Sequence, residues 1–232
     1  MIGLFDPLYL LMMAPAMILA AIASFYTKGT FQKYSRTRCS SGLTGAQAAD
    51  QMLRSKGIHD VNIEQVGGFL SDHYDPMHKT LRLSPDVYNS NSLSAIGVAC
   101  HEAGHALQHA DGYAPLSIRS ALVPATQFGS YGSYIFFVMG MLFHAPGLVK
   151  LGVIFFGVVV AFSIITLPVE WNASARAKKL MVYSGIVSQH ESQQAGQVLN
   201  AAFLTYVASA ISALLTLLYY LLRSGLIGGS DD

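Results

Sequence analysis

The stretch His101-Glu102-Ala103-Gly104-His105, an HExxH pattern, is the most informative part of the chain. Side chains four residues apart share one face of a helix, so both histidines can reach a single Zn²⁺. Glu102 lies beside that face, where a carboxylate can take a proton from a zinc-bound water. The pattern therefore predicts a helix that carries two zinc ligands and a general base. The alternative is a helix whose histidines face water or a partner helix.

The composition is that of a membrane protein. Of the 232 residues, 52% are hydrophobic and only 12% are charged, whereas soluble domains carry about 25% charged residues. The net charge of +1 gives no basic surface, so nucleic acid is not expected as a partner. The two cysteines, Cys39 and Cys100, are too few for a disulfide framework, and we expect free thiols.

Four apolar segments have a length close to the roughly 20 residues that cross a bilayer. They cover about residues 7–26, 121–143, 151–169 and 202–222. The first has no basic leader and no clear cleavage site, so we expect a retained anchor rather than a signal peptide. The second is the weakest, because Gln127 and several glycines and serines dilute it. The expected fold is a mainly α integral membrane protein with about four transmembrane helices.

The polar residues between the first two segments predict a small α+β domain of zincin type. Residues 44–57 are expected to form a helix that Thr44 caps. Residues 61–83 favour a small sheet or hairpin, because short period-two alternation is broken by turn signals. Metalloproteases commonly hold an extended peptide against such an edge strand, although a purely structural hairpin is the alternative. The motif helix should begin after Asn91, with Ser92 as its cap, and end near Asp111-Gly112.

Catalytic zinc usually takes three protein ligands, so the HExxH pattern leaves one to be found. His109 lies four residues beyond His105, but on a straight helix it is about 12 Å from His101 along the axis. Zn–N bonds of about 2.0–2.1 Å cannot easily span that distance. Glu170 follows the third apolar segment. The second and third segments form a two-span hairpin, which returns the chain to the side of the membrane that holds the motif helix. Glu170 is the favoured third ligand, and the alternative is an interface carboxylate paired with Arg176.

At this point the sequence resembles the membrane zinc metallopeptidases of the HtpX and CaaX prenyl endopeptidase type, and more closely the YugP-like bacterial membrane family. The resemblance implies that Glu170 is the third ligand of one Zn²⁺, which it shares with His101 and His105. It covers most of residues 40–180. The matching stretches are Ser71-Asp72-His73-Tyr74-Asp75-Pro76, Leu81-Arg82-Leu83-Ser84-Pro85-Asp86-Val87-Tyr88, His101 to His109, and Leu167-Pro168-Val169-Glu170.

This chain departs from the HtpX type at one position. Those enzymes carry an aspartate four residues after the ligand glutamate, where this chain has Ser174. The carboxylate that usually accepts a hydrogen bond from the second ring nitrogen of a ligating histidine must then come from elsewhere, or a hydroxyl must take its place. The candidate carboxylates are Asp72, Asp75 and Asp111.

The expected organisation has five parts. These are an anchor (1–26), the zincin-like polar domain (27–120), a two-span hairpin (121–169), a helix carrying the third ligand (170–200), and a C-terminal membrane helix with its tail (201–232). Lysines and arginines gather in the second and fourth parts, so we expect both on the cytoplasmic side of a bacterial inner membrane. Lys150 and Arg223 lie on the opposite side and weaken this bias.

The spacing and the resemblance together predict a membrane-embedded zinc endopeptidase that cleaves membrane-associated or unfolded polypeptides. Glu102 is the expected general base. Arg176 and His73 are candidates for stabilising the oxyanion or for supporting a ligand from behind. The alternative is a zinc-binding membrane scaffold or adaptor without turnover. A metal transporter ranks last, because no expected ligand lies at membrane depth. The expected partners are a polypeptide substrate, the lipid bilayer, and a membrane protein or second copy of the chain.

Overall fold

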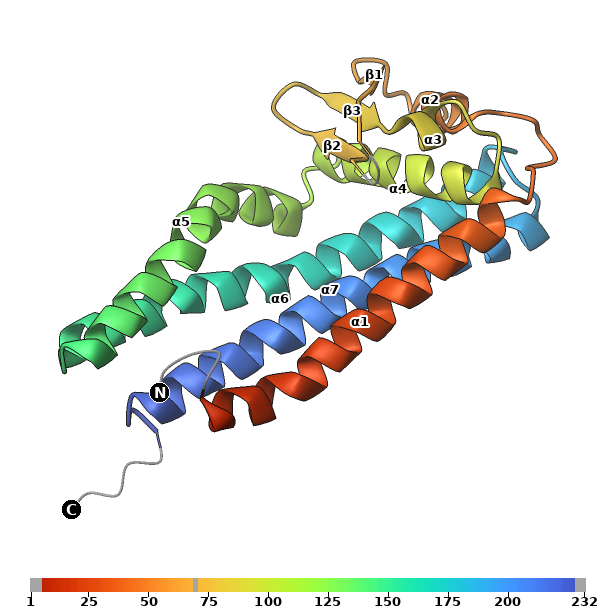
Figure 1. The fold of residues 1–232 in the computed structure, drawn as a ribbon. Coiled ribbons are helices and arrows are strands. Elements are labelled where there is room, and N and C mark those ends of the chain that lie inside the picture. The colour runs from red at the N-terminus through yellow and green to blue at the C-terminus, as the bar shows by residue number, and fades with distance from the viewer. Residues whose placement is uncertain (1–5, 69–70, 228–232) are drawn as a thin grey trace. The chain divides into compact units, whose positions relative to one another are not determined.

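The computed structural model describes residues 6–68 and 71–227, and helices dominate them (Figure 1). Four of the helices are long, and a short sheet interrupts the helical part. The elements are α1 (Pro7–Ser35), α2 (Gly45–Arg54), β1 (Asn62–Gln65), β2 (His73–Asp75), β3 (Thr80–Leu83), α3 (Pro85–Tyr88), α4 (Leu93–Ala110), α5 (Ala114–Leu142), α6 (Pro146–Tyr183) and α7 (Gln189–Arg223).

The chain divides into two compact units. The first, here the span unit, contains residues up to 23, 118–167 and from 205 onward. The second, here the polar unit, contains residues 24–117 and 168–204. Helices α1, α6 and α7 each contribute one part to each unit. The membrane segments and the HExxH motif therefore belong to different units, although continuous helices join them.

Within the span unit, aromatic rings form the core. Phe137 on α5 stacks on Tyr220 of α7 with ring centroids 4.0 Å apart, and Tyr219 is also buried. The Tyr219 hydroxyl donates to Asp6 at 2.9 Å. Glycine contacts bring α5 and α6 together, because a Cβ on Gly152 would lie 2.9 Å from the Ser133 carbonyl oxygen.

Three of the described helices, α1, α6 and α7, are long and apolar enough to cross a membrane, against the four that were expected. Helix α5 contains residues 121–142 of the segment 121–143 and has 29 residues, so its length is sufficient. Its composition is not, because Gln127, Ser130 and Ser133 lie among its apolar residues. The long apolar helices thus make the chain a membrane protein. Of the four expected spans, only segment 121–143 in α5 lacks the hydropathy of a membrane span.

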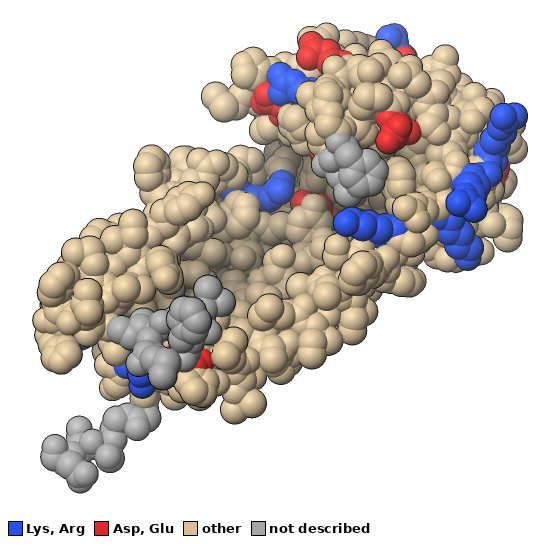
Figure 2. All heavy atoms as spheres, in the orientation of Figure 1, with Lys and Arg blue, Asp and Glu red and all other residues tan. Residues whose placement is uncertain are grey.

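Within the polar unit, the expected helix and sheet are present. Thr44 caps α2, with a reciprocal pair of hydrogen bonds between Thr44 and Gln47. The sheet has the order β1-β3-β2, in which β1 runs parallel and β2 antiparallel to β3. Strand β2 is therefore an edge strand. On the face drawn in Figure 2, charged side chains gather around the sheet and at the neighbouring ends of the long helices.

Helix α4 is the centre of the polar unit. Ser92 caps its N-terminus by accepting a hydrogen bond from the Ala95 amide, and Asp111 ends it, as expected. Gly112 follows with a φ of 63°, a conformation that suits glycine at a helix C-terminus. Helices α2 and α3 and strand β2 pack along α4 (Figure 1). Residues such as Leu93, Ile96 and Ala99 are fully buried beneath them.

The helix expected at residues 170–200 is not a separate element. Residues 170–183 are the C-terminal part of α6, which continues through Pro168 from the apolar segment, and α7 begins at Gln189. Glu170 therefore lies within a helix and not at the start of one.

Candidate metal centre

The side chains of His101, His105 and Glu170 converge within the polar unit. The Nε2 atom of His101 lies 3.1 Å from Glu170 Oε2, and the Nε2 atom of His105 lies 3.6 Å from the same oxygen. One donor atom from each of the three residues lies within 4.8 Å of the others. Glu170 is only 1% exposed and His105 is buried. Two imidazole nitrogens and one carboxylate oxygen are the donor set of a catalytic zinc site, so these residues fit that metal.

The group forms because α4 and α6 approach very closely. A Cβ on Gly104 would lie 2.7 Å from the carbonyl oxygen of Ala173, a distance that no real side chain accepts. Ala103 and Ala177 are also fully buried. Small residues thus allow the backbone of α6 to pass beside the motif, which brings Glu170 to the two histidines. The glycine inside HExxH is a packing requirement of this site.

His105 is oriented from behind by Gln108. The Nδ1 atom of His105 lies 2.9 Å from Gln108 Oε1, and Gln108 has no exposed surface. The Gln108 amide nitrogen donates to the Val169 carbonyl oxygen at 2.8 Å and to Asn172 Oδ1 at 3.0 Å. Since both partners only accept, the amide oxygen must face His105, and Nδ1 carries the proton. The Nε2 lone pair therefore points toward Glu170, as a metal ligand requires.

His101 is held from behind by a hydroxyl. Its Nδ1 atom lies 3.1 Å from Ser174 Oγ, at the position where HtpX-type enzymes carry an aspartate. The three candidate carboxylates have other partners. Asp72 accepts from Ser84, Asp75 pairs with Arg82, and Asp111 pairs with Arg176.

Glu102 faces the edge of the sheet. Its Oε2 atom accepts a hydrogen bond of 3.1 Å from the backbone amide of Tyr74 on β2. The Tyr74 hydroxyl in turn lies 2.9 Å from Nδ1 of His109. Burial, together with the charges of Asp60 and Asp75, raises the pKa of Tyr74 to about 12, so this hydroxyl stays protonated at neutral pH. His109 thus contacts the sheet and is not a member of the converging group.

The two candidate oxyanion residues occupy different places. Arg176 donates through Nε to Asn172 Oδ1 at 2.7 Å and pairs with Asp111. It therefore belongs to the chain of hydrogen bonds that reaches His105 through Asn172 and Gln108. The Nδ1 atom of His73 lies 2.7 Å from the carbonyl oxygen of Ser71 on the exposed side of β2. Within residues 6–68 and 71–227, no recorded bond joins His73 to the converging group.

The charges around His105 act in opposite directions on its pKa. Burial in itself lowers the pKa, but the hydrogen bond with Glu170 and the negative charges of Glu102 and Glu170 outweigh it. The net pKa is raised above its ordinary value. The same carboxylates that would draw a metal cation therefore stabilise a proton on His105 in its absence.

Gln108 and Tyr74 were not expected in this role. Gln108 had a signal in the sequence, because it lies three residues after His105 and so shares its helix face. Tyr74 lay inside a stretch that carried the family resemblance, but its contact with Glu102 depends on how β2 packs on α4.

Comparison with known proteins identifies the family. The family model described as "Putative neutral zinc metallopeptidase" matches residues 9–225. The chain is 44% identical, over 225 residues, to the Bacillus subtilis (strain 168) protein named "Putative membrane protease YugP". That alignment covers 97% of this chain and 99% of the relative. No solved structure gives a match. A zinc metallopeptidase family implies a zinc cofactor, which agrees with the donor set of His101, His105 and Glu170.

Proposed function

The chain belongs to this neutral zinc metallopeptidase family, and we propose that it is a membrane-embedded zinc endopeptidase. The observation that carries the proposal is the convergence of His101, His105 and Glu170, with Glu102 on the same helix as the histidines. When bound, zinc lowers the pKa of a water molecule toward 7 and polarises a carbonyl oxygen. The three converging residues hold the metal, and Gln108 and Ser174 keep the two imidazole rings in a ligating orientation.

Glu102 acts as the general base and then as the general acid. Its carboxylate takes the proton of the attacking water and delivers it to the amine that leaves. The Tyr74 amide holds one carboxylate oxygen, Oε2, at 3.1 Å, which leaves Oε1 for the water. A carboxylate held in this way is positioned before the substrate arrives, so it needs little reorganisation during the reaction.

The substrate is proposed to be an extended segment of a membrane-associated or unfolded polypeptide. Strand β2 is an edge strand whose Tyr74 amide already points away from β3, toward Glu102. An extended peptide can bind such an edge by main-chain hydrogen bonds. The contacts of Arg176 favour a role behind His105 over a direct role on the oxyanion, and a role for His73 on the oxyanion stays a prediction.

Metal analysis of the purified protein tests the metal centre. We expect about one zinc per chain in the wild type and loss of zinc in Glu170→Ala. Glu191→Ala is a matched control, because it removes another glutamate of the polar unit that is bonded to Ser40 and Ser188 instead. Zinc content that is unchanged in Glu170→Ala would overturn the proposed ligand set.

A second variant separates turnover from metal binding. Glu102→Gln should keep zinc near the wild-type content and lose cleavage of an unfolded protein such as casein. If Glu102→Gln cleaved as well as the wild type, the peptidase mechanism would be wrong. If both proteins bound zinc and neither cleaved any polypeptide, the alternative of a scaffold without turnover would be favoured. The small residues that suggested such a scaffold pack α5 against α6 inside the span unit, as Gly129 and Gly152 do.

A further inference from the structure

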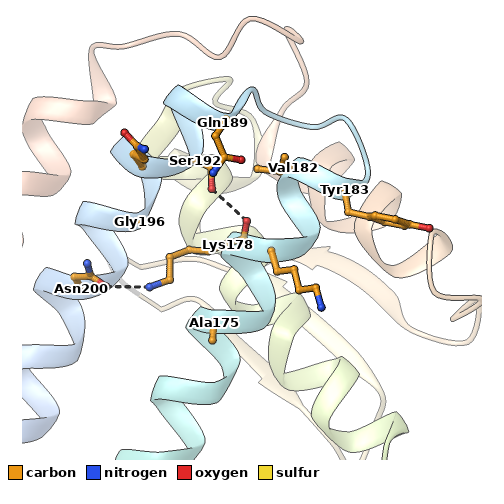
Figure 3. A pocket seen from close by; sticks show the side chains of 10 residues that line it. Ala175, Lys178, Val182, Tyr183, Gln189, Ser192, Gly196 and Asn200 are labelled. Atoms are coloured by element: carbon orange, nitrogen blue, oxygen red, sulfur yellow. Dashed lines mark hydrogen bonds between the residues drawn. The ribbon is translucent and has the colours of Figure 1, made fainter.

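A groove on the polar unit lies apart from the metal centre. It opens between the C-terminal part of α6 and the N-terminal part of α7 and has a volume of about 810 Å³. It is lined from α6 by Lys178, Val182 and Tyr183, and Asn200 lies across it on α7 (Figure 3). Lys179 of α6 also lines it. Successive residues of a helix are about 100° apart. Lys179 and Val182 therefore point about 180° and 120° away from Glu170, and Lys178 lies about 12 Å from it along the helix axis. The groove is thus separate from the three converging side chains.

The charge of the groove favours an anion. Two of its ten lining residues, Lys178 and Lys179, are cationic, and none is acidic. Lys178 Nζ donates to Asn200 Oδ1 at 3.2 Å (Figure 3). In the part of the chain that the structure describes, neither lysine forms an ion pair with a carboxylate. Side-chain amides and hydroxyls of Gln189, Gln193 and Ser192 add neutral hydrogen-bonding groups.

Lys178 is held in the groove by its neighbours. Its aliphatic stem passes over Gly196, where an added Cβ would lie 3.0 Å from Lys178 Cδ. Its ammonium lies 5.5 Å from the centroid of the Trp171 ring. The stem and the head are therefore both fixed, and the charge is presented at a defined point. A freely moving surface lysine would have neither contact.

The groove follows the apolar segment of α6 and precedes that of α7. Lys178 and Lys179 follow the apolar segment of α6, and Asn200 precedes that of α7. Trp171 is 57% exposed and packs edge-on against Phe203 with ring centroids 5.2 Å apart. Exposed tryptophan beside lysine is typical of the bilayer interface. Trp171 and Phe203, which lie on the membrane side of Lys178, suit the apolar end of a ligand whose other end is anionic.

We propose that this groove binds the phosphate headgroup of an anionic phospholipid from the leaflet on the metal-centre side of the membrane. Lys178 and Lys179 contact the phosphate, and the upper acyl chains lie beside Trp171. Basic pockets between membrane helices bind lipid headgroups in this way. A soluble phosphate would make no use of the apolar side chains of Trp171 and Phe203 beside Lys178. The proposal does not depend on peptidase activity, so either can fail without the other.

The single tryptophan of the chain, Trp171, makes the proposal measurable. The full-length protein is reconstituted in vesicles of phosphatidylcholine and phosphatidylglycerol, and bromine is placed on the acyl chains of one lipid at a time. Bromine quenches only a nearby tryptophan. We expect phosphatidylglycerol to occupy the position beside Trp171 about five-fold or more in preference to phosphatidylcholine. Each variant is normalised to its own fluorescence in unbrominated lipid.

Two double variants with the same loss of charge separate the groove from the general surface. Lys178→Gln with Lys179→Gln should remove the preference, whereas Lys28→Gln with Lys33→Gln on α1 should keep it within about two-fold, because those lysines lie outside the groove. The zinc content of each variant reports whether the polar unit has folded. Should the first double variant lose zinc, Lys179→Gln alone, at an exposed position, is expected to lower the preference in part.

Three results would overturn the proposal. The first is equal quenching by both lipids in the wild type. The second is an equal loss of preference in the control double variant, because surface charge alone would then explain the effect. The third is loss of the preference when inorganic phosphate replaces chloride at constant ionic strength, because the groove would then take a soluble anion.

Discussion

Gln108 is a buried side chain that sets the tautomer of His105, a proposed metal ligand. Its amide is fixed by two acceptors, the Val169 carbonyl oxygen and Asn172 Oδ1. Asn172 itself accepts from Arg176, which pairs with Asp111 at the surface. A chain of hydrogen bonds therefore runs from the protein surface to His105. Its direction is set by Arg176, which can only donate.

We expect Gln108→Leu to lower zinc affinity by about 10–100-fold, the usual effect of losing a group behind a ligating histidine. The leucine cannot accept from Nδ1, so the ring loses both its tautomer preference and its orientation. Affinity is measured by competition with a chromogenic chelator. Gln51→Leu is the control, because Gln51 donates to the Ser184 carbonyl oxygen away from the metal centre. Zinc affinity within two-fold of wild type in Gln108→Leu would contradict the role of this side chain.

At this scale the sequence predicted the residues that share a motif. His101 and His105 follow from helical spacing, and Glu170 from the returning hairpin and the family resemblance. Ser174 and Gln108 could not be chosen as the groups behind the histidines, because that requires the side-chain directions of two packed helices. The candidate aspartates, Asp72, Asp75 and Asp111, are all bonded to other partners.

The packing of α4 on α6 places Glu170, the proposed third ligand, beside His101 and His105. Gly104 lies at the closest point, and its substitution by alanine places a Cβ 2.7 Å from the Ala173 carbonyl oxygen. Neither group is a flexible side chain, so the two helices must separate. Glu170 would then move away from His101 and His105 together.

We therefore expect Gly104→Ala to lose zinc and to lower the stability of the protein by about 1–3 kcal/mol, the usual cost of overpacking. Gly157→Ala in α6 is the matched control, because its Cβ would meet nothing within 4 Å. That variant should be neutral or slightly more stable, since alanine favours helix over glycine by roughly 0.5–1 kcal/mol. Thermal unfolding in detergent and zinc content measure both. Normal zinc content in Gly104→Ala would show that the helices can separate without moving the ligand.

The pairing of β2 with β3 should depend on pH. Asp75 on β2 accepts from Arg82 Nη1 at 2.7 Å, and this bond, with further bonds to His78, holds the Asp75 pKa well below its ordinary value of 3.8. A lowered pKa means that the stability from Asp75 is fully present above the ordinary value and is lost as the pH falls below it.

The expected result is that amide protection in residues 73–83, corrected for intrinsic exchange, falls with the pH below about 4. Asp75→Asn should lower the amide protection of these residues at neutral pH, and their protection should then change less as the pH falls. Asp60→Asn serves as the control, because Asp60 and its partner Lys79 are exposed. The same acid dependence in wild type and Asp75→Asn would assign the effect to another group.

Among the secondary-structure elements, the capped ends of helices were easier to predict than whether a helix continues past a change in polarity. Thr44 and Ser92 are capping residues in the structure as in the sequence, because a cap is a local hydrogen bond. The sequence suggested a boundary at Glu170, where apolar residues give way to polar ones. Helix α6 continues there, since backbone hydrogen bonds do not depend on side-chain polarity. The parallel pairing of β1 with β3 joins residues far apart along the chain and had no local signal.

At the scale of the whole molecule, the membrane topology depends on whether α5 crosses the membrane. Its composition does not mark it as a span, whereas that of α6 does. The metal centre supplies a second argument, because His105 and Glu170 lie on the same side of any membrane when their atoms are 3.6 Å apart. The chain between these residues must then cross an even number of times. Helix α6 accounts for one crossing, and α5 is the one helix between them that can supply the other.

We therefore expect α5 to cross the membrane despite its polar residues, with residue 67 in the cytoplasm and residue 147 on the opposite side. Cys39 and Cys100 are buried free thiols, so a membrane-impermeant maleimide should hardly label the wild type. Gly67→Cys and Gly147→Cys each place a thiol where nothing lies within 4 Å. In intact spheroplasts Gly147→Cys should be labelled, and Gly67→Cys should be labelled only after permeabilisation. Labelling of both from the same side would exclude the second crossing. The reverse pattern would keep the crossing and invert the orientation, because the parity argument fixes the number of spans and the lysine and arginine distribution fixes their direction.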